Sequence, residues 1–165
     1  MHCLFSMTDK HKVFLGLGSN LGDREENIRK AIALIGERVG LVIRQSSLIE
    51  TEPWGFESDN KFLNAVILCE TTLTPRQLLR ATQRIERDLG KLRKHSTVRS
   101  QSSKFFDERS GRAERKVQSS KYNDRPIDID ILLYDDLTID EPDLKIPHPL
   151  MHERDFVMIP LREIQ

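Results

Sequence analysis

Hydrophobic and polar residues follow two different periods along this chain. Short stretches rich in Val, Ile, Leu and Phe predict β-strands over residues 12–17, 41–51, 61–71 and 125–134. Apolar residues that recur at helical spacing predict α-helices over residues 23–36 or 23–40 and over residues 75–89. The predicted elements therefore come in the order strand, helix, strand, strand, helix, strand.

Both predicted helices carry end signals. Asp23 is a candidate N-cap of the first helix. Thr74 and Gln77 are spaced as a capping box at the start of the second, and Gly90 is its expected C-terminal stop. From this order of elements we expect an α+β fold, a ferredoxin-like βαββαβ sandwich whose helices pack on a mostly antiparallel sheet.

The last predicted strand contains two acids within an apolar run. Asp128 and Asp130 are two residues apart, so in a strand they share one face, with Cα atoms roughly 6 to 7 Å apart. Two carboxylates repel one another on a buried face, and one or two hard cations between them would relieve that repulsion. The alternative is an ordinary half-exposed strand whose polar face meets water. The pattern by itself leaves both interpretations open.

The segment over residues 91–124 differs in composition from the rest of the chain. It is rich in Ser, Gln, Lys and Arg, it has no sustained helical or strand period, and it is the most basic part of the molecule. We expect a flexible catalytic loop that covers a polyphosphate and its metal. The alternative is a disordered insertion without function. Residues 1–11 are expected to be an N-terminal extension, and residues 12–165 a single domain.

Three other features are candidates for ligand contacts, and each has a structural alternative. The loop at residues 52–60 holds the only Trp beside Pro and Gly, and could present groups to a ligand or pack as a surface turn. Asn64, in a strand expected to be buried, must find hydrogen-bond partners in a neighbouring loop or a ligand. His148, fixed between two prolines, could face the same anion as Arg154, although a single His is more often structural.

Glycines before the first predicted helix resemble part of a dinucleotide-binding motif. Gly16 and Gly18 have the first spacing of that motif, but the next glycine, Gly22, comes one residue late. We therefore expect these glycines to permit a tight turn from strand to helix.

Charge and composition narrow the classes of function. The 26 basic and 26 acidic residues of the 165-residue chain cancel, which argues against a dedicated nucleic-acid-binding protein. Two cysteines form no disulfide framework, as expected in a reducing compartment. There is no signal-peptide pattern and no apolar run of about 20 residues. We expect a soluble, cytoplasmic monomer that binds neither nucleic acid nor a membrane.

Several motifs occur in one order and spacing, at residues 16–23, 51–55, 62–65, 83–86, 125–131, 147–149 and 154–156. Together they resemble the 6-hydroxymethyl-7,8-dihydropterin pyrophosphokinases of the folate pathway, over about residues 13–164. The resemblance implies transfer of the β,γ-diphosphate of ATP to the hydroxymethyl group of 6-hydroxymethyl-7,8-dihydropterin. The products would be AMP and the pterin diphosphate, and two Mg²⁺ ions would act as cofactors on Asp128 and Asp130.

The resemblance also implies roles for individual residues. The catalytic residues would be Arg93, Arg125, Asp128 and Asp130. The ATP site would comprise Gln83, Glu86, Lys91, Arg93, Lys121, Arg125, Ile131, His148 and Arg154. The pterin site would comprise Thr51, Trp54, Phe62, Asn64, Tyr122 and Phe156. The chain departs from the family pattern at Lys91, where Arg is common, and at Lys121 and Tyr122, where Arg and Trp are frequent.

Two other functions are compatible with the order of elements. An RNA-binding module has the same order, but the central strands lack its aromatic-rich signature. A nucleotidyl transferase on the same fold is a nearer alternative, and it would release pyrophosphate where the pyrophosphokinase releases AMP. The nucleotide product therefore distinguishes the three functions, because an RNA-binding module would not consume ATP.

Overall fold

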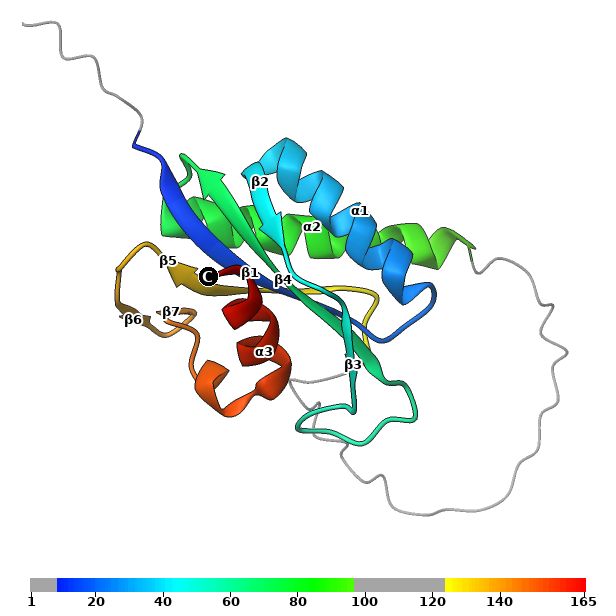
Figure 1. Cartoon of the computed structure of the whole chain (residues 1–165). Coiled ribbons are helices and arrows are strands. Elements are labelled where there is room, and N and C mark those ends of the chain that lie inside the picture. Colours follow the sequence, from blue (N-terminus) through cyan, green and yellow to red (C-terminus); the bar gives the residue numbers. More distant parts are fainter. Residues whose placement is uncertain (1–8, 97–123) are drawn as a thin grey trace, which may run out of the picture.

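The structure, a computed structural model, describes the backbone of residues 9–96 and 124–165 and the side chains of residues 9–90 and 124–165. Figure 1 shows a sheet with helices on two sides. In chain order the elements are β1 (His11–Ser19), α1 (Arg24–Arg38), β2 (Gly40–Gln45), β3 (Ile49–Thr51), β4 (Phe62–Thr71), α2 (Pro75–Ser96), β5 (Asp128–Tyr134), β6 (Ile139–Glu141), β7 (Leu144–Ile146), the 3-10 helix η1 (Met151–Glu153) and α3 (Asp155–Ile164).

The main sheet has the strand order β2-β4-β1-β5, and β3 also pairs with β4. All of these pairs are antiparallel, which confirms the expected α+β class with an antiparallel sheet. The register places Gly18 of β1 between Asn64 of β4 and Asp128 of β5. Strands distant in sequence thus bring an amide and a carboxylate to either side of a residue that has no side chain.

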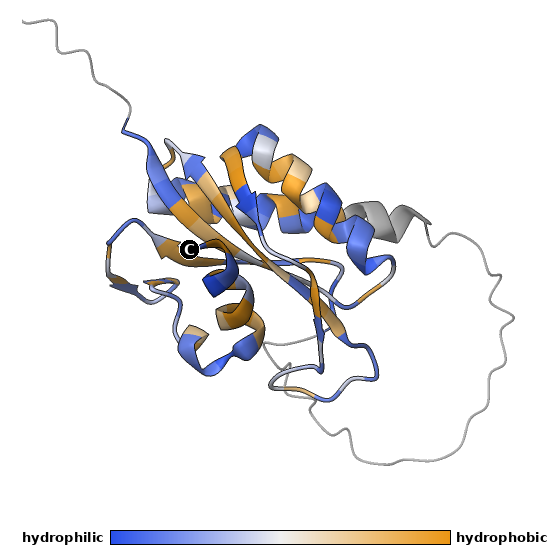
Figure 2. Cartoon of the chain, in the orientation of Figure 1, coloured by the Kyte–Doolittle hydropathy of each residue, from blue (hydrophilic) through white to orange (hydrophobic). Residues whose placement is uncertain are grey.

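The two faces of the sheet have different coverings. On one face, alternate residues of β1, β4 and β5 pack against α1 and α2 in the larger core, as Val13, Leu15 and Ile67 do. Figure 2 shows apolar residues gathered on the central strands and on these helices. On the other face α3 packs against Leu132 and Val66. The same face continues past α3 into a pocket, described below.

The starts of both long helices agree with the sequence signals. Asp23 is the N-cap of α1, and its Oδ1 accepts a hydrogen bond from the Glu26 amide at 3.0 Å. The capping box at α2 also forms, since the Gln77 amide donates to Thr74 Oγ1 and the Thr74 amide donates to Gln77 Oε1. These side chains satisfy amide groups that the first helical turn leaves without partners.

The predicted end of α2 was wrong. The helix does not stop at Gly90 but continues to Ser96. A glycine inside a helix costs only about 1 kcal/mol relative to alanine, and the preceding turns are held by the buried Ile85 and Leu89. Residues 91–96, expected in the basic loop, are therefore helical, and residues 97–123 of that loop lie outside the described part of the chain.

Two other predictions of local structure need correction. The strand expected over residues 41–51 is divided into β2 and β3, and between them the buried Ser46 replaces the regular ladder, with its Oγ accepting from the Val66 amide at 2.9 Å. Gly16 and Gly18 lie inside β1, while the turn residue with positive φ is Gly22. Pro160 lies buried inside α3, although proline ordinarily kinks or breaks a helix.

Within residues 9–96 and 124–165, no helix is both long and apolar enough to cross a bilayer.

Candidate active site

The Asp-x-Asp pair lies at the start of β5. Asp128 and Asp130 are partly exposed on one face, with side chains 31% and 36% exposed, while Ile129 and Ile131 are buried on the other. This alternation confirms that the two acids share a face. The Arg125 guanidinium lies 3.2 Å from Asp128 Oδ1 and supplies a positive charge beside the pair.

A third acid approaches the pair from α2. Glu86 Oε1 accepts a hydrogen bond from the Ile129 amide at 2.8 Å, which places this carboxylate next to β5. Burial raises the pKa of Glu86 to about 7, and the charge of Asp128 adds to the effect. Desolvation also raises the pKa of Asp130, with further contributions from the charges of Asp128 and Glu86. The site therefore concentrates negative charge that a bound cation would stabilise.

The donor set can be tested against the requirements of a divalent cation. Mg²⁺ is commonly bound through one or two carboxylates while water and phosphate oxygens fill its remaining positions. Asp128 and Asp130 provide two such carboxylates beside open space. Among the described residues no cluster of three or more His, Cys, Asp or Glu side chains forms a complete cage. Two carboxylates beside open space fit a cation whose remaining positions are filled by water or phosphate oxygens.

One pocket lies on the face of the sheet next to α3, and we call it the aromatic pocket. It encloses about 640 Å³ of empty space, including its open mouth, and its ring-bearing lining residues are Trp54, Phe56, Phe62 and Phe156. Gly18 forms part of its wall, because a Cβ there would lie 3.2 Å from Asn64 Oδ1 and 3.4 Å from a ring carbon of Phe62. The aromatic pocket can accommodate a flat ring between apolar side chains.

Asn64 contributes a fixed amide to the aromatic pocket. Only 6% of this residue is exposed, and its Nδ2 donates a hydrogen bond to Thr51 Oγ1 at 2.8 Å. This contact supports the structural interpretation, in which Asn64 ties β4 to β3. Asn64 also lines the pocket, so the same side chain is held where it can meet a polar ligand.

Arg154 lies where the aromatic pocket meets a second pocket. Its guanidinium carbon is 4.3 Å from the centre of the Trp54 ring and 5.7 Å from that of Phe156. Only 5% of the residue is exposed, so the cation is stacked on aromatic faces in a poorly hydrated environment. Its positive charge acts on Asp130, where it opposes the rise in pKa.

The second pocket, which we call the polar pocket, lies between α2, β5 and the segment after β7. It contains about 1340 Å³ of empty space including solvent, and Gln83, Glu86, Ile131 and His148 are among its lining residues. His148 Nε2 is 3.8 Å from Asp130 Oδ1. Burial, followed by the charge of Arg154, lowers the pKa of His148, so the neutral imidazole is favoured at pH 7.

Every predicted site residue whose side chain is described lines one of these two pockets. The residues predicted for the pterin line the aromatic pocket: Thr51, Trp54, Phe62, Asn64 and Phe156. Those predicted for ATP line the polar pocket: Gln83, Glu86, Arg125, Ile131, His148 and Arg154. Four charged side chains line both, namely Arg125, Asp128, Asp130 and Arg154. The side chains of Lys91, Arg93, Lys121 and Tyr122 lie outside the described residues.

Several lining residues of the aromatic pocket were not predicted from the sequence, among them Gly18 and Phe56. Gly18 was assigned to a turn, although alternation along β1 places it on the same face as Gly16. Phe56 lies two residues after Trp54 in the same loop, and its ring packs edge-on against Phe62 at 6.0 Å between centroids. An aromatic residue so close to Trp54 was a usable signal for the pocket.

Comparisons with known proteins identify the family of the chain. The sequence model of the family described as 7,8-dihydro-6-hydroxymethylpterin-pyrophosphokinase matches residues 14–107 and 100–165. A 2-amino-4-hydroxy-6-hydroxymethyldihydropteridine pyrophosphokinase from Porphyromonas gingivalis is 41% identical over 92% of this chain and 89% of its own length. A protein of the same name from Aquifex aeolicus is 37% identical over 93% and 79%, respectively.

A third relative with this name, from Bacillus subtilis, is 36% identical over 92% of this chain and 76% of its own length. These matches confirm the resemblance that the ordered motifs carry. The chain therefore belongs to the 7,8-dihydro-6-hydroxymethylpterin-pyrophosphokinase family, and it is an ATP-dependent pyrophosphokinase.

Proposed function

We propose that this enzyme transfers the β,γ-diphosphate of ATP to the hydroxymethyl group of 6-hydroxymethyl-7,8-dihydropterin in folate biosynthesis, giving AMP and the pterin diphosphate. The main support is that two pockets of different chemistry share Asp128 and Asp130. A flat ring in one pocket and a nucleotide in the other would bring the acceptor hydroxyl and the phosphates to the same carboxylates.

The aromatic pocket is proposed to bind the pterin. A pterin is a flat heterocycle with many donors and acceptors, so it needs both aromatic faces and an oriented amide. Phe62 and Phe156 offer the faces, and Asn64 offers the amide. The hydrogen bond from Asn64 to Thr51 would fix the orientation of that amide before the ligand arrives.

The polar pocket is proposed to bind ATP. Gln83, Ile131 and His148 lie on its walls and would contact the nucleoside, while Arg125 and Arg154 carry positive charge towards the shared acids and would bind phosphate oxygens. The predicted contributions of Lys91, Arg93, Lys121 and Tyr122 stay predictions from the family resemblance. Arg93 would add a further catalytic charge to the phosphates.

Asp128 and Asp130 are proposed to hold two Mg²⁺ ions. When bound, the ions would neutralise phosphate charge and favour in-line displacement at phosphorus. The residues of the chain would orient the two substrates and exclude water from the aromatic end of the site. Glu86, with a pKa near 7, would add to the negative charge next to β5.

We also propose that the fold is the ferredoxin-like sandwich expected from the sequence. The strand order β2-β4-β1-β5, with α1 and α2 packed on one face, supports this description. A cytoplasmic monomer that binds ATP and the pterin, and neither nucleic acid nor a membrane, remains our proposal for the state in which it works.

Isothermal titration with a nonhydrolysable ATP analogue tests the role of the acids. The wild-type protein should bind at least about tenfold more tightly with Mg²⁺ than without it, and Asp128→Asn should lose most of this difference. Asp88→Asn is a matched control, because Asp88 pairs with Arg38 and is not among the residues that line either pocket. Equal affinity with and without Mg²⁺ in the wild type would contradict the assignment.

A further inference from the structure

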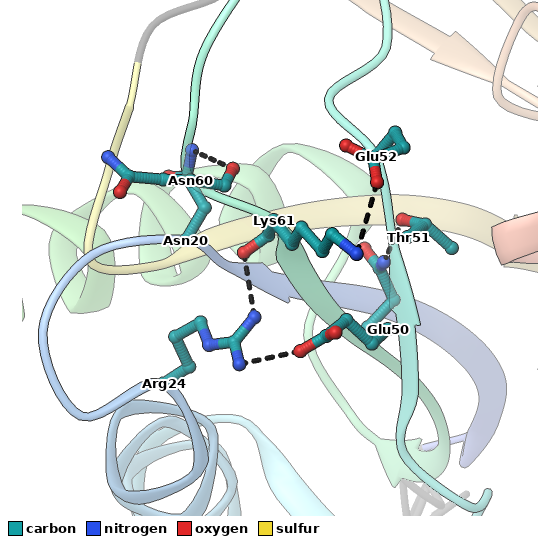
Figure 3. A network of polar contacts seen from close by, with 8 residues as sticks. Asn20, Arg24, Glu50, Thr51, Glu52, Asn60 and Lys61 are labelled. Carbon is teal, nitrogen blue, oxygen red and sulfur yellow. Dashed lines mark hydrogen bonds and ion pairs between the residues drawn. The ribbon is translucent and has the colours of Figure 1, made fainter.

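The loop over residues 52–61 carries Trp54 and Phe56 into the aromatic pocket and connects β3 to β4. A loop that forms one wall of a binding site must be held in position, or the ligand bears the entropic cost of ordering it. Figure 3 shows polar contacts around both ends of this loop. Arg24 and Asp124 lie outside the loop and form hydrogen bonds with it.

Arg24 joins the two strand ends from which the loop emerges. Its Nη2 donates to Glu50 Oε2 at 2.7 Å, and its Nη1 donates to the Lys61 carbonyl oxygen at 2.8 Å (Figure 3). Lys61 Nζ in turn lies 3.2 Å from Glu52 Oε1. Because the planar guanidinium bonds both ends at once, it fixes the width of the base of the loop.

Asp124 joins the far end of the loop to β5. Its Oδ2 accepts from Asn60 Nδ2 at 2.9 Å, and its Oδ1 accepts from Asn20 Nδ2 at 2.6 Å. Asn20 also exchanges hydrogen bonds with the backbone of Arg125, accepting from its amide at 2.8 Å and donating to its carbonyl at 3.2 Å. Hydrogen bonds lower the pKa of Asp124, and the largest contribution comes from the Ser58 hydroxyl, followed by Asn20 and Asn60.

These contacts connect two parts of the site that have separate ligands. Asp124 immediately precedes Arg125 and is four residues before Asp128, whereas Asn60 and Ser58 belong to the loop that carries Trp54. Three side-chain donors converge on one carboxylate that is otherwise open to water. An exposed carboxylate with no positional role would be solvated, without ordered partners from two separate segments.

We propose that Asp124 is a positioning residue for the pterin, which holds the loop over residues 52–61 in register with the metal-binding strand β5. The proposal rests on the function proposed above and deepens it, since it assigns the pterin half of the site a residue that contacts neither substrate. Asp124 thereby sets the distance between the aromatic wall and Asp128, and so between the pterin hydroxyl and the phosphates.

The single tryptophan makes the position of the loop measurable. Trp54 is the only Trp of the chain, so its emission and acrylamide quenching report on this loop alone. Asp124→Ala should increase quenching of Trp54 and raise the Kd of the pterin, titrated with Mg²⁺ and an ATP analogue present, by about tenfold. The Kd of the ATP analogue alone should stay within about twofold of the wild-type value. Asp88→Ala, which removes an exposed ion pair with Arg38, should change none of these quantities.

A double variant distinguishes a positioning role of Asp124 from a role in the stability of the fold alone. Asp124→Asn combined with Asn60→Asp exchanges donor and acceptor between the two side chains and keeps an acceptor for Asn20. It should restore pterin affinity towards the wild-type value, whereas Asp124→Asn alone places two amide groups in opposition and should weaken it.

Failure of the Asp124 proposal can be distinguished from failure of the proposed function. Absence of pterin binding by the wild-type protein would defeat that function. Unchanged Trp54 quenching in Asp124→Ala, or a pterin Kd within twofold of the wild type, would overturn the positioning role. Equal weakening of pterin and ATP analogue together with a lower Tm would likewise overturn it, because Asp124 would then serve stability alone.

Discussion

At the scale of single residues, the site depends on where side chains are missing as much as on where they are present. Gly18 lies between Asn64 and Asp128 in the sheet register, and the absence of its side chain leaves room for the pocket. Arg154 shows the converse, since a large cation stacked on Trp54 separates the aromatic pocket from the polar pocket. Small changes at either position should act on ligands before they act on the fold.

Comparison of Gly18→Ala with Gly16→Ala tests whether the missing side chain at Gly18 makes room for the pterin. A Cβ at Gly18 would lie 3.2 Å from Asn64 Oδ1, so it should displace the amide and raise KM for the pterin by about tenfold or more. A Cβ at Gly16 meets only side-chain carbons of Leu132 at 3.4 to 3.6 Å, and it should have a smaller effect. Steady-state kinetics for both substrates measure the difference. A larger effect at Gly16 than at Gly18 would contradict the pocket as described.

Much of the chemistry could be predicted from single residues, but the contacts between residues distant in sequence could not. Alternation along one strand was enough to place Asp128 and Asp130 on one face, because that relation is local. The approach of Asn64 to Gly18, and of Asp124 to Asn60, depends on register between distant segments. No local pattern encodes that register, so these contacts required the folded structure.

At the scale of elements, the order was predictable and several ends were not. Caps made of polar side chains, as at Asp23 and Thr74, are short-range signals and were read correctly. Gly90 was expected to end α2, and proline ordinarily breaks a helix, yet both Gly90 and Pro160 lie inside helices whose buried faces outweigh the local cost. Tertiary packing therefore determines how far α2 and α3 extend. The few residues around Gly90 or Pro160 do not reveal that packing, because it involves residues distant in sequence.

Alanine substitutions at two glycines should change the free energy of unfolding in opposite directions. Gly90→Ala should raise the free energy of unfolding by about 0.5 to 1 kcal/mol, because the helical site is open and alanine favours the helix. Gly40→Ala should lower it by at least about 2 kcal/mol, because the new Cβ would overlap the Glu70 carbonyl oxygen at 1.9 Å. Urea unfolding of both variants measures the two changes. Destabilisation by Gly90→Ala would mean that α2 does not continue through this position.

At the scale of the whole molecule, the two pockets meet at β5, the last strand in the order of the main sheet. One face packs against α1 and α2 and forms the larger core. The opposite face carries α3 beside the aromatic pocket, and β5 contributes the acids that the polar pocket shares. The aromatic pocket thus lies on the face opposite α1 and α2, whereas the polar pocket reaches α2 itself. Under the proposed function, both ligands would approach the same two carboxylates of β5.

Identification of the nucleotide product tests this account most directly. Protein, Mg²⁺, ATP and 6-hydroxymethyl-7,8-dihydropterin are mixed and followed by ³¹P NMR, alongside Asp130→Asn and the control Asp88→Asn. AMP and pterin diphosphate should form in equal amounts, at a rate lowered at least about a hundredfold in Asp130→Asn and unchanged in the control. Release of ADP or free pyrophosphate by the wild type, or full activity of Asp130→Asn, would contradict it.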